Sequence, residues 1–183
     1  LCMDAFQCAA GSPNQELYRK SLETLLRGYP NLEAAKYWQF FYAQHLEDAE
    51  DFSGAADAYA RVDREHEHYL EAGFRRVRTS AQAAAQGLAR EPGATANALI
   101  NVNAVATAYR DLITRATAIG SEKDAKQSQE IQDLLAQARL WLAEAYLLAG
   151  VNRADQALEL LSDFESTFGR TTPYLGRLWQ ARL

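Results

Sequence analysis

Apolar residues recur along this chain at the three- and four-residue spacing of an amphipathic helix. The pattern is clearest over residues 36–62, KYWQFFYAQHLEDAEDFSGAADAYARV, where it predicts two short helices joined by a tight acidic turn. A similar unit recurs over residues 141–164, WLAEAYLLAGVNRADQALELLSDF. No segment shows the alternating β-branched and polar residues that are typical of a strand. The pattern therefore predicts an all-α fold of antiparallel helical hairpins.

Turn and capping residues divide the chain into about eight helices. Asn31 and Asn152 stand where side chains cap a helix N-terminus, and residues 121–124 resemble a capping box. We expect helices over residues 12–28, 32–48, 53–64, 67–89, 95–118, 121–149, 152–167 and 173–183. The middle helices are longer than the outer ones, which predicts an irregular array. Residues 1–11 are unpatterned, so the predicted single domain covers residues 12–183.

Composition supports the helical prediction and narrows the function. Alanine, the strongest helix former, is the commonest residue, and proline and glycine lie mostly at segment ends. A net charge of −5 at pH 7 argues against general nucleic-acid binding, which requires a basic surface. No apolar run approaches the roughly 20 residues that span a bilayer, so we expect no transmembrane segment.

The first residues leave two questions open. The chain begins with Leu1 rather than methionine, which suggests a processed product or a fragment in which a targeting signal would not be visible. Cytoplasmic and periplasmic locations are therefore both open. Cys2 and Cys8 are the only cysteines, and they form either a disulfide or two free thiols.

The hairpin at residues 36–62 resembles the tetratricopeptide repeat (TPR). In that family, small residues let two antiparallel helices touch while large residues fill the groove beside them. The matching residues, which follow the family pattern without gaps, are Tyr42, Ala43, Leu46, Phe52, Ala55, Tyr59 and Val62. The unit at residues 141–164 matches more loosely, after two residues are inserted in its turn. Its matching residues are Leu142, Ala143, Tyr146, Gly150, Ala157, Leu161 and Phe164.

A third, partial match is the helix that ends in Gly28-Tyr29-Pro30, like the second helix of a repeat. The helices expected over residues 67–118 do not match, and Trp38 lies one place from the tryptophan of the family. The resemblance covers about half of the chain and implies an irregular, TPR-like α-solenoid. It also implies a concave groove that binds a segment of another protein.

Catalytic and metal-binding motifs are weak in this sequence. Glu65 and His68 have the Glu-x-x-His spacing of di-iron bundles, but those sites require a second such pair and further carboxylates. A zinc site from His66, His68 and a distant ligand is an alternative, and we favour a polar connector between helices. No Gly-x-Ser-x-Gly, His-Glu-x-x-His or glycine-rich phosphate loop is present. We therefore predict no enzyme activity, no cofactor and no metal site.

The candidate partner-binding residues form two groups. Within the first aromatic run, Trp38 and Phe41 are the candidates, because aromatic side chains anchor protein interfaces. The alternative is that this run forms core between two helical layers. The second group, Arg75, Arg76 and Arg78, is a concentrated basic patch. The resemblance implies a clamp for an acidic peptide or a C-terminal carboxylate, and the alternative is a solvated helix face.

We predict a protein–protein interaction scaffold or adaptor that binds a partner segment on a concave helical-repeat groove. A structural or spacer portion of a larger protein or cell-envelope assembly is the second hypothesis. A small-molecule sensor or enzyme is the third, and an enclosed pocket with converging polar groups would favour it. The identity of the partner and the oligomeric state are not predicted.

Overall fold

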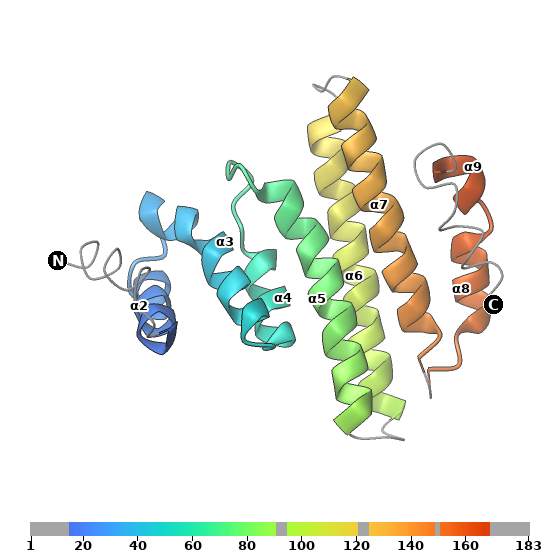
Figure 1. Cartoon of the computed structure of the whole chain (residues 1–183), viewed down its shortest axis with the longest axis horizontal. Coiled ribbons are helices and arrows are strands. Elements are labelled where there is room, and N and C mark those ends of the chain that lie inside the picture. Colours follow the sequence, from blue (N-terminus) through green and yellow to red (C-terminus); the bar gives the residue numbers. More distant parts are fainter. Residues whose placement is uncertain (1–14, 91–94, 121–124, 149–150, 169–183) are drawn as a thin grey trace. The chain divides into compact units, whose positions relative to one another are not determined.

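The computed structural model describes residues 15–90, 95–120, 125–148 and 151–168, and every regular element within them is an α-helix. The all-α prediction is therefore confirmed (Figure 1). The helices are α2 (Gln15–Gly28), α3 (Glu33–Asp48), α4 (Phe52–Ala60), α5 (Tyr69–Arg90), α6 (Thr95–Gly120), α7 (Ala125–Tyr146), α8 (Ala154–Leu161) and α9 (Phe164–Phe168). The predicted capping box at 121–124, the helix at 173–183 and both cysteines lie outside the described residues.

The chain divides into two compact units, unit 1 (residues 1–72) and unit 2 (residues 73–183). The boundary falls inside α5, near its first turn.

The α3–α4 hairpin forms the centre of unit 1. Ala43 and Ala55 are fully buried in one core cluster, where small side chains let the two helices approach closely. Tyr59 fills the space beside them, and its hydroxyl donates a 2.8 Å hydrogen bond to Glu47 Oε2. The cluster contains Phe40, Ala43, Leu46, Ala55, Ala58, Tyr59, Val62 and Ala72. Five of the seven hairpin residues that match the TPR pattern lie in this core cluster, and the other two, Tyr42 and Phe52, are half-buried.

Helix α2 adds a third layer to unit 1 by packing against α3. The ring of Tyr18 lies edge-on to His45, with ring centroids 5.6 Å apart. Helix α4 begins with a side-chain cap, since Asp51 Oδ1 accepts a 3.0 Å hydrogen bond from the Gly54 backbone N–H.

Both predicted asparagine caps are wrong. Helix α3 begins after Leu32, which occupies the N-cap position without a side-chain hydrogen bond, so Asn31 lies one residue too early to cap it. Helix α8 begins after Arg153, again without a side-chain cap. Asn152 instead adopts a positive φ of 52° in the turn, a conformation that asparagine tolerates better than most residues.

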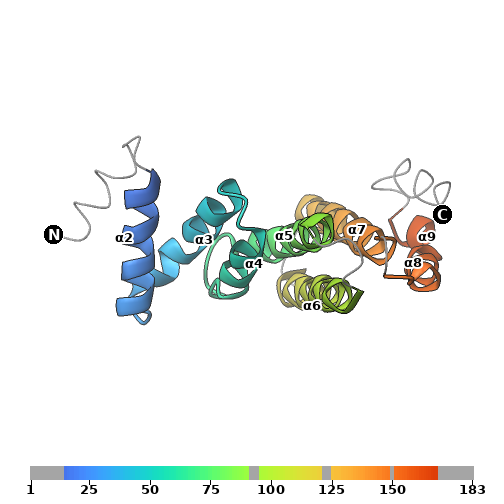
Figure 2. The same ribbon diagram turned by 90° about the horizontal axis from the view of Figure 1, so that it is seen from below.

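Unit 2 contains the long helices, which confirms that the middle of the chain forms the longest elements. Helices α5, α6 and α7 have 22, 26 and 22 residues. Helix α6 packs against α7, and α8 packs against α7 in turn. Figure 2, which views these helices nearly end-on, shows α6 below α5 and α7. The α7–α8–α9 core cluster contains Ala136, Leu140, Ala143, Ala157, Leu161, Phe164 and Phe168.

Candidate partner-binding cleft

The connector between α4 and α5, residues 61–68, builds one wall of the candidate site. Asp63 starts a tight turn within it. Its Oδ1 accepts a 3.0 Å hydrogen bond from the Glu65 backbone N–H, and its carbonyl accepts one of 3.1 Å from the His66 N–H. An aspartate that bonds to the backbone two residues later is a common way to fix such a turn.

His66 ties this connector to α3. Its Nδ1 accepts a 3.0 Å hydrogen bond from the backbone N–H of His68. In the neutral ring the proton therefore resides on Nε2, which donates a 2.9 Å hydrogen bond to the carbonyl of Tyr37. The rings of His66 and Tyr37 also stack, with centroids 5.6 Å apart and an angle of 28° between their planes. Both nitrogens of His66 thus serve to position the connector.

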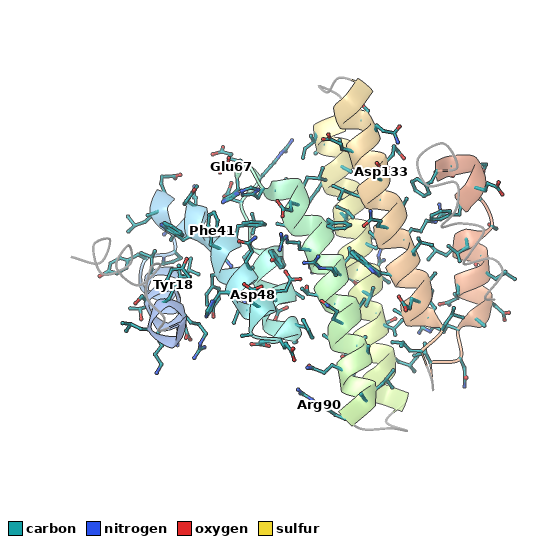
Figure 3. The ribbon with its side chains drawn as sticks, in the orientation of Figure 1. Tyr18, Phe41, Asp48, Glu67, Arg90 and Asp133 are labelled. Carbon is teal, nitrogen blue, oxygen red and sulfur yellow. The ribbon has the colours of Figure 1, made fainter. Side chains whose placement is uncertain are left out.

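A surface pocket opens at Tyr37, between the start of α3 and the connector. Its cavity volume is about 280 Å³, and the Tyr37 side chain is among the exposed large hydrophobic groups, with 45 % of the residue accessible. The lining residues of this Tyr37 pocket are Glu33, Lys36, Tyr37, Asp63, Glu65, His66 and Glu67. Figure 3 shows side chains of α3 and of the connector, including those of Phe41 and Glu67, on this part of unit 1.

The Tyr37 pocket is strongly acidic. Four carboxyl groups and one ammonium group line it. The ammonium of Lys36 lies 3.0 Å from Glu33 Oε1. Its hydrogen bond to Glu33, with the negative charges of Glu33, Asp63 and Glu65, raises the pKa of Lys36 above its usual value. The pocket therefore favours a positive charge.

A second depression continues from the Tyr37 pocket along α3. Its cavity volume is about 670 Å³, and it shares Lys36 and Asp63 with the first. Its lining comes from α2, the α2–α3 loop, α3 and the connector: Glu23, Leu26, Arg27, Pro30, Asn31, Ala35, Lys36, Gln39, Tyr42, Arg61 and Asp63. Partial burial raises the pKa of the Tyr42 hydroxyl on its wall. We refer to the two depressions together as the α3 cleft.

The two aromatic candidates from the sequence lie next to this cleft. Trp38 and Phe41 are both half-buried. The centroid of the Tyr37 ring is 5.2 Å from that of Trp38 and 5.4 Å from that of Phe41. Phe41 also packs against the core cluster of unit 1. Both rings thus lie against that of Tyr37, and it is Tyr37 that lines the pocket.

The three arginine candidates belong to unit 2 and have different surroundings. Arg76 Nη1 donates a 3.0 Å hydrogen bond to Asp111 Oδ2 on α6. Arg75 and Arg78 are half-buried. Arg78 lines a groove between α5 and α7 with a cavity volume of about 310 Å³. This α5–α7 groove is lined by Arg78, Ala81, Gln82, Ala85, Trp141, Glu144, Ala145 and Leu148.

The histidines of the Glu-x-x-His segment make contacts of their own. His68 Nδ1 lies 3.0 Å from Glu71 Oε2, and its ring stacks on Phe40 with centroids 4.5 Å apart. Among the described residues, no group of three or more His, Cys, Asp or Glu side chains is placed to hold a metal ion. The helices within the described ranges also include none that is long and apolar enough to cross a membrane.

Tyr37 and the acidic lining were not among the binding residues predicted from the sequence. A partial signal was present, because Tyr37 precedes Phe40 by three positions and so lies at the flank of the core-facing stripe. The exposed face of its ring depends on where the connector lies. That placement comes from the bond between His66 and the Tyr37 carbonyl, which joins positions 29 residues apart.

The chain matches no known family model, no curated protein and no solved structure.

Proposed function

We propose that the protein is an interaction module that binds a segment of another protein in the α3 cleft. The observation that carries this proposal is the exposed ring of Tyr37, held at the mouth of a pocket that continues along α3. Tyrosine combines a large apolar area with few rotatable bonds, so it binds a partner at low cost in conformational entropy.

The aromatic rings around Tyr37 favour its role as a partner-binding residue. Its ring has Trp38 and Phe41 on its flanks and stacks on His66. Little freedom is left for the ring to lose when a partner binds, and preorganisation of this kind improves affinity. A surface ring without such neighbours would lose more conformational freedom when a partner binds.

The shape of the α3 cleft favours an extended segment over a small molecule. The cleft is open along α3 and consists of two connected depressions, where small-molecule sites are usually enclosed. A chain of several residues could place one side chain in the Tyr37 pocket and continue past Lys36 and Asp63, which both depressions share.

The proposal includes a TPR-like arrangement of hairpins for the chain as a whole. It draws support from the buried small residues Ala43 and Ala55 between α3 and α4, and from Ala143 and Ala157 in the α7–α8 core. In such an arrangement, α2 would correspond to the second helix of a preceding hairpin, which agrees with its packing on α3.

A peptide selection with matched variants tests the proposed function. Peptides would be selected on the full chain from a random library, and their affinities measured again with Tyr37→Ala. We expect a loss of at least about tenfold, because an aromatic anchor typically contributes more than 1 kcal/mol. Tyr29→Ala is the control, since Tyr29 is 56 % exposed on the α2–α3 loop and does not line the cleft. A library that yields no binders, or binders equally tolerant of both changes, would contradict the proposal.

A further inference from the structure

We propose that the Tyr37 pocket is a subsite for an arginine side chain of the bound segment, with the guanidinium group over the Tyr37 ring and between the surrounding carboxylates. The inference rests on the proposed function only in attributing this side chain to a partner protein. The arginine patch suggested a partner with acidic residues. Here the partner carries the basic residue, and the chain supplies the acidic pocket.

The size of the pocket fits a single long side chain. Its cavity volume of about 280 Å³ is just below the range of drug-sized ligand sites, which begins near 300 Å³. It opens to the surface, and none of its lining residues belongs to the core cluster of unit 1. A flexible side chain can enter such a pocket from a backbone that lies along the outside.

The aromatic wall suits a planar cation. The exposed Tyr37 ring stacks on His66 and so presents a fixed face. A guanidinium over such a ring is attracted by its quadrupole, and arginine stacks in this way more readily than lysine because its head group is planar and weakly hydrated. The surrounding carboxylates can then accept its N–H groups at the edge.

Lys36 provides a second, independent observation, because it is a cation already held in this pocket. Its ammonium lies 3.0 Å from Glu33 Oε1. The hydrogen bond to Glu33 and the negative charges of Asp63 and Glu65 raise the pKa of Lys36. One ammonium cannot balance four carboxyl groups. Glu65 and Glu67, both exposed on the connector, are placed to take a second cation.

A small probe tests the subsite without reference to any partner. N-acetyl-arginine methylamide would be titrated into the full chain and followed through the ring resonances of Tyr37. The citrulline derivative is the matched probe, because it has nearly the same shape and no charge. We expect saturable shifts with the arginine probe and binding weaker by about tenfold with citrulline. Equal effects of both probes, or no shift at Tyr37, would overturn the proposal.

Charge-changing variants then locate the site. Glu65→Gln should lower the affinity for the arginine probe several-fold, whereas the control Asp57→Asn, which removes an exposed carboxylate of α4 outside the pocket, should not.

Lys36→Met removes the cation already in the pocket and should raise the affinity for the arginine probe by about fivefold, as expected when a nearby like charge is removed. Lys20→Met is its control, since Lys20 is exposed on α2 and does not line the pocket. Weaker binding with Lys36→Met would contradict the proposed arrangement.

The two proposals fail in different ways. If selected peptides bind the α3 cleft but tolerate replacement of every arginine by citrulline, the segment-binding function stands and the arginine subsite is wrong. If the arginine probe binds at Tyr37 and the library yields no peptides, the subsite stands and the segment-binding function is wrong.

Discussion

Tyr59→Ala is expected to lower the free energy of unfolding of unit 1 by about 3–5 kcal/mol, the usual cost of deleting a fully buried large aromatic side chain. Tyr59 is 0 % exposed in the α3–α4 core, and its ring lies 5.7 Å from that of Phe40. Urea denaturation of the full chain, followed by circular dichroism, measures the change.

Tyr59→Phe separates packing from hydrogen bonding. It keeps the ring and removes the hydroxyl that donates the 2.8 Å bond to Glu47 Oε2. We expect a cost of about 1.5–3 kcal/mol, as for other hydrogen bonds to charged groups. If both substitutions lower the free energy of unfolding equally, the packing of the Tyr59 ring does not stabilise the α3–α4 hairpin.

Asp111→Asn is expected to destabilise unit 2 by about 3 kcal/mol, because it removes the charge that balances a buried cation. Asp111 Oδ2 accepts 3.0 Å hydrogen bonds from Arg76 Nη1 and from Arg115 Nε. Arg115 is only 2 % exposed. It lies under Gly73, where a Cβ atom would stand 2.8 Å from the Cδ of Arg115, so its side chain has little room to reach water. Thermal or urea denaturation provides the measurement.

The double substitution Asp111→Leu/Arg115→Met is the control for this prediction. It removes the buried pair and leaves Arg76, whose side chain is 22 % exposed, without this carboxylate. Replacing a buried ion pair by apolar side chains of comparable volume is often neutral or stabilising. The double variant should therefore be clearly more stable than Asp111→Asn. A double variant as unstable as Asp111→Asn would show that the cost arises from lost packing and not from an unbalanced charge.

The helical class and the core of the hairpins could be predicted from the sequence, because both depend on local spacing. The match to the TPR pattern identified Ala43, Ala55 and Tyr59, and all three are buried in one cluster. Some helix ends were also predictable, since breakers such as Gly28 and the segment after Arg90 mark the ends of long periodic runs. The single helix expected over residues 152–167 is wrong, because a turn at residues 162–163 separates α8 from α9.

The helix caps were less predictable. Asn31 and Asn152 have the right residue type, but capping requires one particular backbone position, and a shift of one residue removes it. In the turn before α8, a positive φ takes the asparagine away from the cap position. Composition around a turn cannot distinguish these two uses of the same residue.

The candidate site was only partly predictable. The sequence pointed to the aromatic run that borders the proposed cleft and named Trp38 and Phe41, whose rings lie against that of Tyr37. The acidic lining comes from two segments about 30 positions apart that meet through the His66 hydrogen bond to Tyr37. Such a contact between distant segments leaves no periodic signal in a single sequence.

The most direct test of the account is to map where a selected arginine-containing peptide contacts the full chain, from chemical-shift changes on titration. If the arginine side chain occupies the Tyr37 pocket, the largest changes fall on Lys36 and Tyr37 of α3 and on Glu65 of the connector. Changes confined to unit 2, such as the α5–α7 groove at Trp141, would contradict it.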